Sequence, residues 1–140
     1  MKNFLTTEDT ELHGGKNMEL EEITKKIIKY AMDVHTALGP GLLENAYKEC
    51  LYYKLCKAGF YVEKEKPIPL VFDGVNLDCG YRIDLLVENN VVIELKSVRK
   101  IEAIHLSQIL THMKLGKFKV GLLINFNVTS LRYGIKRVVN

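Results

Sequence analysis

Residues 81–96 read YRIDLLVENNVVIELK, and this stretch decides the fold. Two apolar runs flank a short polar segment, which is typical of two antiparallel strands joined by a tight loop. Each run also carries charged side chains at its end far from the loop, including Asp84, Glu94 and Lys96. Charged groups on an otherwise apolar sheet are costly unless they are used. Binding of a divalent metal ion is the use that two carboxylates suggest first.

The register of this hairpin determines which side chains share a face. A three-residue loop over 88–90 gathers one apolar face from the pairs Val87–Val91, Leu85–Ile93 and Ile83–Leu95. The other face then carries the charged pairs Asp84–Glu94 and Arg82–Lys96. A two-residue turn at Asn89-Asn90 is the competing arrangement, but it mixes apolar and charged residues on each face. Burial therefore favours the three-residue loop, with Asn90 in the left-handed conformation that closes it.

The paired carboxylates have two interpretations. Directly opposed like charges on a sheet destabilise it by up to about 1 kcal/mol, and a bound Mg²⁺ or Mn²⁺ would reverse that sign. Lys96 points to the same side as Glu94, where an ammonium can hold a water molecule or stabilise an oxyanion. The alternative is a surface network of Asp84, Glu94, Arg82 and Lys96 with no function beyond mutual neutralisation.

Length and composition indicate one ordinary globular domain. The chain has 140 residues, of which 47% are hydrophobic and 26% charged. No apolar run approaches the ~20 residues that span a bilayer, and residues 1–17 lack the apolar centre of a signal peptide. We therefore expect a cytoplasmic protein without a membrane partner, with a disordered N-terminal extension over 1–17 and a single domain over 18–140. The three cysteines suggest neither disulfides nor a zinc site.

Charge is distributed unevenly along the chain. Residues 1–90 hold 11 Lys/Arg and 15 Asp/Glu, a net charge of −4, whereas residues 91–140 hold 9 and 2, a net charge of +7. A basic C-terminal part can attract phosphates. A solvated lysine-rich surface without a ligand explains the same distribution.

Hydrophobic periodicity predicts an α/β (α+β) fold with a mixed sheet between helices. Helices are predicted over 20–38, 42–58 and 101–115, and strands over 60–66, 67–72, 75–77, 80–87, 91–98 and 119–125. The segment 128–139 is predicted to add a last strand or a short helix.

Two motifs resemble a known nuclease group. Asp84 and the run Glu94-Leu95-Lys96 resemble the signature of the PD-(D/E)xK nuclease superfamily, with Ile83 in place of the usual proline. The segment 41–47, GLLENAY, resembles the small nuclease-like family named for Gly-x-x-Glu-x-x-Tyr. The similarity continues through 108–110 and 121–126, so it covers about residues 20–126.

The resemblance implies a restriction-endonuclease-like core: a central mixed sheet of four or more strands flanked by helices, in the order ααβββαβ. It implies a nuclease that hydrolyses nucleic-acid phosphodiesters, of DNA more than RNA, with Mg²⁺ or Mn²⁺. Asp84, Glu94 and the backbone carbonyl of Leu95 would ligate the metal. Lys96 would position or activate the attacking water.

Further residues follow from the same resemblance. Glu44 would be an additional metal-binding carboxylate, and Gln108 a supporting polar residue. The family usually has tyrosine four residues after that glutamine, where this chain has His112. Substrate contacts are expected from Tyr47, Arg82, Arg99 and Lys100. Without the family, an ordinary Glu44–Lys48 ion pair and a core-edge role for Tyr47 are the simpler interpretations.

Two other functions stay open at this point. The first is a catalytically silent nucleic-acid-binding or regulatory module with the same fold. The second is a subunit whose site is completed only in a homo-oligomer or a larger complex.

Overall fold

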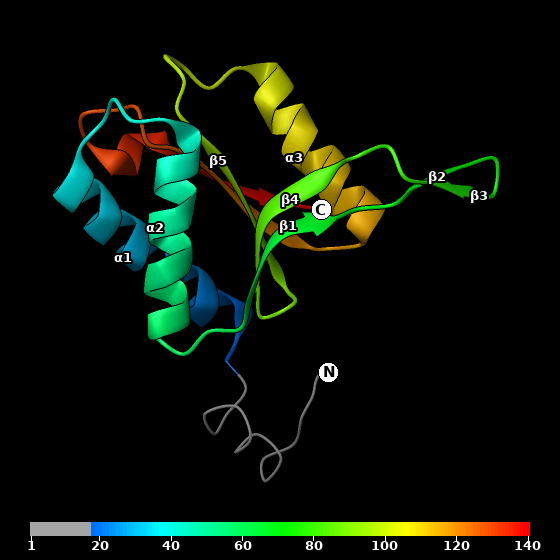
Figure 1. Ribbon diagram of the computed structural model, residues 1–140, viewed down its shortest axis with the longest axis horizontal. Helices are drawn as coiled ribbons and strands as arrows, with labels where there is room; N and C mark the ends of the chain where they lie inside the picture. Colours follow the sequence, from blue (N-terminus) through cyan, green and yellow to red (C-terminus); the bar gives the residue numbers. More distant parts are fainter. Residues whose placement is uncertain (1–17) are drawn as a thin grey trace, which may run out of the picture.

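The computed structural model describes residues 18–140, so the predicted disorder of 1–17 falls outside the described residues. Its elements, shown in Figure 1, are α1 (Leu20–Leu38), α2 (Glu44–Lys57), β1 (Val62–Pro67), β2 (Leu70–Phe72), β3 (Val75–Leu77), β4 (Arg82–Val87), β5 (Val91–Lys96), α3 (Ala103–Gly116), β6 (Val120–Asn125), the 3₁₀ turn η2 (Leu131–Gly134) and β7 (Ile135–Val139). The predicted elements are all present. The segment after β6 contains both a short helix and a strand.

A five-stranded mixed sheet in the order β1-β4-β5-β6-β7 forms the centre of the molecule. All its pairs are antiparallel except β5 with β6, which run parallel and are connected through α3. Helices α1 and α2 cover one face of the sheet and α3 covers the other (Figure 1). This arrangement confirms the predicted mixed α/β architecture. No helix among residues 18–140 is long and apolar enough to cross a bilayer.

The sheet is apolar on both faces in its middle strands. Every residue of β6 is buried, and so are the first five of β5, as expected where helices cover both sides. Gly121 allows α3 to pack closely on β6, because a Cβ there would lie 2.7 Å from Met113 Sδ. The close contact places the inner face of α3 over the end of β5, where the charged residues lie.

The β4–β5 hairpin has the predicted register, with Val87 opposite Val91 and Leu85 opposite Ile93. The left-handed residues of its loop are Glu88 (φ 54°) and Asn89 (φ 56°). The prediction that Asn90 takes this conformation was therefore wrong. Two successive left-handed residues turn the chain in the sense that suits the twist of antiparallel strands.

A second hairpin, β2–β3, projects from the body of the molecule beyond the first residue of β4 (Figure 1). Its register joins Leu70 with Leu77 and Phe72 with Val75. Asp73 and Gly74 form the turn, both at positive φ, as the Asp-Gly dipeptide predicts. This hairpin extends the chain between β1 and β4 and is separate from the main sheet.

Candidate functional site

The charged end of the β4–β5 hairpin departs from a regular ladder. Paired residues end at Leu85–Ile93, and beyond them Asp84 Oδ2 accepts a hydrogen bond from the Leu95 backbone N–H at 2.8 Å. The predicted direct pairs Asp84–Glu94, Ile83–Leu95 and Arg82–Lys96 are therefore absent. The physical reason is competition, because the carboxylate takes the donor that a backbone carbonyl would otherwise use.

This local opening of the ladder leaves polar groups facing one gap. The N–H and C=O of one strand residue face the same neighbouring strand. The carbonyl of Leu95 therefore faces β4, on the side where the Asp84 carboxylate binds the Leu95 N–H. On the other side of β5, the Lys96 carbonyl accepts a hydrogen bond from Phe126 N at 2.9 Å. The Asp84 carboxylate and the Leu95 carbonyl thus share one gap at the end of the hairpin.

Glu94 is a buried carboxylate beside Asp84. Its residue is 8% exposed, and burial raises its pKa above the ordinary value of 4.5. A hydrogen bond from His112 opposes that shift, the charge of Asp84 adds to it, and the charges of His112 and Lys96 oppose it. The Asp84 carboxylate reaches the backbone N–H of Leu95, the residue directly after Glu94, so the two carboxylates lie at the same end of the hairpin. A pair in this state gains from a cation more than a solvated pair does.

His112 is the direct partner of Glu94. Its Nδ1 lies 3.1 Å from Glu94 Oε2, and the imidazole donates to the carboxylate. The ring also packs against Tyr81, with 5.8 Å between the centroids. In the sequence, His112 is a departure from a family pattern, and its contact with Glu94 was not predicted. Its position one helical turn after Gln108 was the available signal, since both residues then face the same part of the sheet.

If Asp84 and Glu94 hold a divalent ion, replacement of His112 by phenylalanine should weaken its binding about 10- to 100-fold, because the carboxylate of Glu94 loses the donor that orients it. The ring and its contact with Tyr81 are retained, so the fold should be preserved. Titration with Mn²⁺, followed by calorimetry, measures the affinity. Unchanged Mn²⁺ affinity in this variant would show that His112 does not orient a metal-binding carboxylate.

Lys96 and Gln108 lie together at the end of β5. Lys96 is the last residue of β5, and its ammonium donates to Gln108 Oε1 on α3 at 3.4 Å. Neither Asp84 nor Glu94 forms a direct ion pair with Lys96, although the Lys96 charge lowers the pKa of Glu94. Lys96 follows Glu94 by two residues on β5, and its ammonium has the amide of Gln108 as a hydrogen-bond partner.

Glu44 lies apart from the two carboxylates. It is the exposed first residue of α2 and makes no hydrogen bond or ion pair with the described residues. Ser97, directly after β5, donates to the Leu42 carbonyl at 2.6 Å and so holds this helix end near the end of β5. Within residues 18–140, no three His, Cys, Asp or Glu side chains are close enough to hold a metal ion. Asp84, Glu94 and Glu44 thus do not form one ligand group here.

Tyr47 is completely buried, which contradicts the prediction that it contacts substrate. Its hydroxyl donates to the Gly39 carbonyl at 2.5 Å and accepts from Leu42 N at 3.1 Å. Its ring stacks on Phe126 with centroids 4.4 Å apart. The burial follows from the long, sharply turning segment before α2, whose backbone groups need a partner inside the protein. Tyr47 therefore holds the loop that presents Glu44.

Replacement of Tyr47 by phenylalanine tests this structural role. The ring packing is retained and two hydrogen bonds are lost, so we expect a loss of about 1–3 kcal/mol in the free energy of unfolding. Denaturant titration measures it. Nucleic-acid affinity should stay unchanged at temperatures where the variant is folded. A variant of parental stability with weakened nucleic-acid binding would contradict the assignment.

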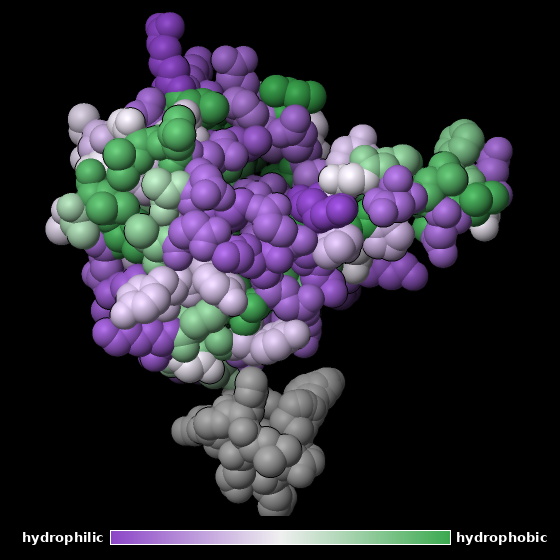
Figure 2. All heavy atoms as spheres, in the orientation of Figure 1, coloured by the Kyte–Doolittle hydropathy of each residue, from purple (hydrophilic) through white to green (hydrophobic). Residues whose placement is uncertain are grey.

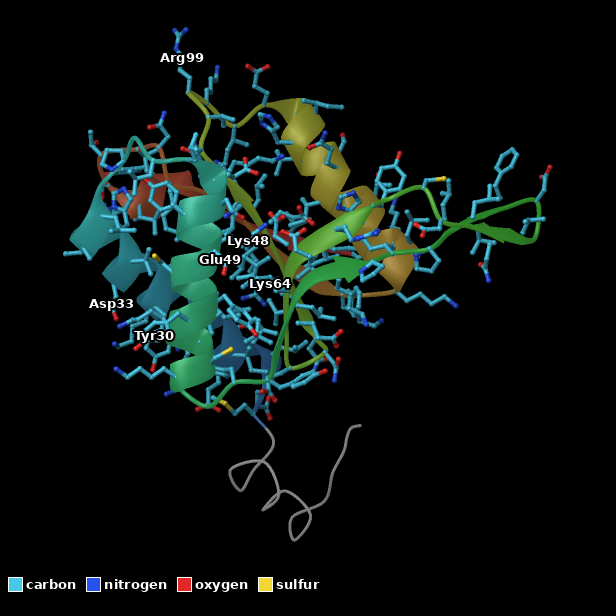
Figure 3. All side chains as sticks on the ribbon, viewed as in Figure 1. Tyr30, Asp33, Lys48, Glu49, Lys64 and Arg99 are labelled. Carbon is cyan, nitrogen blue, oxygen red and sulfur yellow. The ribbon has the colours of Figure 1, made fainter. Side chains whose placement is uncertain are left out.

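The predicted substrate-binding cations occupy two places. Arg82 donates to the Tyr81 carbonyl at 2.9 Å and lies 3.9 Å from Asp78. Arg99 and Lys100 are exposed in the loop between β5 and α3, where they line a hollow of about 400 Å³ with Val98, Glu102 and His105. Figure 3 shows Arg99 pointing away from the body of the molecule.

The loop that carries Arg99 and Lys100 is fixed by Asn125, the buried last residue of β6. Its side-chain amide accepts from Val98 N at 3.0 Å and donates to Val98 O at 2.9 Å. This contact was not predicted from the sequence. A single polar residue at the end of a fully buried strand was the signal, because such a group needs hydrogen-bond partners.

The surface over this region is hydrophilic. Figure 2 shows mainly hydrophilic side chains between α2 and α3, around a recess in that face. The charged end of the hairpin, the start of α2 and the polar side chains of α3 all lie in this part of the fold. The site is therefore open to a polar ligand.

Comparison with known proteins gave one match. Residues 21–138 match the family model described as the PD-(D/E)XK nuclease superfamily. The matched range includes Asp84, the Glu94-Leu95-Lys96 run and Gln108. No curated protein and no solved structure matches the chain.

Proposed function

This chain belongs to the PD-(D/E)XK nuclease superfamily, and from that premise we propose that it hydrolyses nucleic-acid phosphodiester bonds with a divalent cation, Mg²⁺ or Mn²⁺. DNA is the proposed substrate before RNA. The mixed five-stranded sheet with helices on both faces is consistent with a restriction-endonuclease-like fold. The narrower assignment to the Gly-x-x-Glu-x-x-Tyr family stays a prediction.

One observation carries the proposal: at a break in the sheet the Asp84 carboxylate binds the backbone N–H of Leu95, which lies between the buried Glu94 and Lys96 on β5. Carboxylate and carbonyl oxygens are the donors that Mg²⁺ and Mn²⁺ prefer. Asp84, Glu94 and the Leu95 carbonyl would hold the ion. Three protein oxygens fit Mg²⁺, which keeps several of its waters. Glu44 would then act through water rather than by direct ligation.

A bound cation supplies charge relief at the phosphate and a water molecule that is more easily deprotonated. The chain's own residues supply orientation. Lys96 would place its ammonium beside the attacking water, and the hydrogen bond to Gln108 would help to orient that ammonium. His112 donates to one oxygen of Glu94, and the other oxygen of that carboxylate would be left to hold the ion. Arg82, Arg99 and Lys100 would contact phosphates of the strand on either side of the reacting group.

Metal dependence is the first test. Labelled single-stranded and double-stranded DNA and RNA are incubated with the protein in Mg²⁺, in Mn²⁺ and in EDTA, and the products are separated by size. We expect cleavage with either ion and none in EDTA. Salt-sensitive binding without cleavage in any condition would contradict the proposal and would instead indicate a silent nucleic-acid-binding module.

A further inference from the structure

The pairing of β4 with β1 is also interrupted at Asp84, as its pairing with β5 is. In the β1–β4 ladder, Lys64 pairs with Leu85 and Lys66 with Ile83, which leaves Glu65 opposite Asp84 without a ladder pairing. Glu65 has φ 56°, in the left-handed region. This conformation is uncommon for a residue other than glycine, and costs on the order of 1 kcal/mol or more.

The alternation of side chains between the two faces of the sheet is interrupted in β4 at Asp84. Leu85 packs in the core on the α1 and α2 side, whereas Ile83 packs in the core on the α3 side. Residues two apart in a regular strand share one face, so the alternation breaks at Asp84. Both neighbours of Asp84 are therefore distorted: Glu65 on β1 has left-handed backbone, and Leu95 on β5 has lost its ladder partner to a carboxylate. Strain that gathers at one level of a sheet is characteristic of a functional site.

Glu65 has a partner on α2. The ammonium of Lys48 forms a hydrogen-bonded ion pair with Glu65 Oε2. The Lys48 side chain is 13% exposed, whereas that of Glu65 is 45% exposed. Lys48 lies one helical turn after Glu44 on the same face of α2, and its ion pair with Glu65 joins that face to the level of Asp84. The Glu44–Lys48 ion pair considered from the sequence is thus replaced by a longer-range pair.

A neighbouring ion pair provides a comparison. Glu49, next to Lys48 on α2, accepts from Lys64, next to Glu65 on β1, at 2.8 Å. Figure 3 shows Lys48 and Glu49 on α2 facing Lys64 on β1. The side chains of this second pair are 46% and 33% exposed. It already joins α2 to β1 at the surface, so the fold does not need a strained residue at 65 for that purpose.

We propose that Lys48 is a substrate-binding residue that contacts a phosphate of the nucleic acid, and that Glu65 occupies its ammonium until the phosphate arrives. This inference rests on the proposed nuclease function. A largely buried ammonium needs an anion beside it. The half-exposed Glu65 carboxylate can turn into solvent, where water replaces its partner, while the phosphate takes its place at Lys48. The strand then passes over the α2–β1 side of the site as well as over the Arg99–Lys100 loop.

The two members of the pair should have effects of opposite sign on binding. A labelled DNA duplex is titrated with the full chain in EDTA, so that cleavage does not interfere, at several salt concentrations. Lys48→Gln should weaken binding about fivefold and lower the log–log salt slope by about 0.9, the contribution of one phosphate. Glu65→Gln should strengthen binding about twofold to fivefold, because the ammonium loses its competitor. Glu49→Gln is the matched control, with no change expected.

If the Lys48–Glu65 ion pair only stabilises the fold, the two variants should not change DNA binding in opposite directions. If Lys48→Gln and Glu65→Gln weaken binding alike, or if Lys48→Gln leaves the salt slope unchanged, the inference is overturned. Thermal unfolding checks that each variant is folded. If Lys48→Gln does not fold, the binding measured with Glu65→Gln still decides the test. A parent that binds no DNA even at low salt overturns the inference too. Metal-dependent cleavage by the parent with unchanged binding in Lys48→Gln overturns this inference and leaves the nuclease proposal intact.

Discussion

Asp84→Asn is expected to reduce phosphodiester cleavage at least about 10³-fold, since loss of a metal carboxylate removes several kcal/mol of transition-state charge stabilisation. Asparagine keeps an oxygen that can accept the Leu95 N–H bond now made by Asp84 Oδ2. The variant should therefore fold like the parent. Initial rates with a labelled DNA substrate in Mg²⁺ measure the effect, and thermal unfolding verifies the fold.

Two further variants make this prediction specific. Lys96→Gln should cause a loss of similar size, because the ammonium beside the buried carboxylate is removed. Asp33→Asn is the matched control, since Asp33 on α1 pairs only with exposed Lys29 and Lys54 among the described residues. Lys114→Gln, an exposed position on α3, controls for loss of one positive charge. Parental cleavage rates in both Asp84→Asn and Lys96→Gln would show that the activity resides elsewhere or in a contaminant.

Glu94→Gln is expected to separate stability from activity. Burial raises the pKa of Glu94 in the metal-free protein, so ionisation of this carboxyl costs free energy in the folded state. Glutamine removes the charge and can still accept from His112. We expect a gain on the order of 1 kcal/mol in the free energy of unfolding and a rise of about 4 °C in Tm. Cleavage should fall at least about 10³-fold, as for the other carboxylate.

The pH dependence of stability is a second test of the raised pKa of Glu94. Between the ordinary pKa of 4.5 and the raised pKa of the folded state, the folded protein binds more protons at Glu94 than the unfolded chain does. The contribution of Glu94 to the free energy of unfolding therefore falls as pH rises through that window. Comparison of metal-free parent with Glu94→Gln by denaturant titration isolates this contribution. A stability difference that does not change with pH, or a less stable variant at neutral pH, would contradict a folded-state pKa of Glu94 that burial raises.

The regular parts of the fold follow from the sequence because the local signals agree. Helix α1 has the predicted bounds, Leu20–Leu38, since its apolar period is unbroken until Gly39-Pro40-Gly41. The β4–β5 register was predictable because a shift of one residue would have buried charges. Helix α2 begins two residues later than predicted, at Glu44. Leu43 is extended and 81% exposed, so its hydrophobicity gave a misleading helix signal.

The site itself was predictable only in its residue types. Asp84, Glu94 and Lys96 were identified as charged residues on apolar strands. The prediction continued regular backbone pairing past them and did not consider that a side chain can bind the backbone there. The bond from Leu95 N to Asp84 cannot be read from periodicity, because it depends on a side chain outcompeting a backbone carbonyl. The contact of His112 with Glu94 depends on how α3 lies over the sheet. The Lys48–Glu65 pair likewise depends on how α2 packs against β1.

Direct observation of the metal ion tests the central proposal best. Crystals grown with Mn²⁺ are measured at a wavelength where manganese scatters anomalously, for the parent and for Asp84→Asn. We predict one anomalous peak bounded by Asp84, Glu94 and the Leu95 carbonyl in the parent, and its loss in the variant. A parent crystal that cleaves DNA when dissolved in Mn²⁺, yet shows its manganese peak elsewhere or none between these two carboxylates, would contradict it.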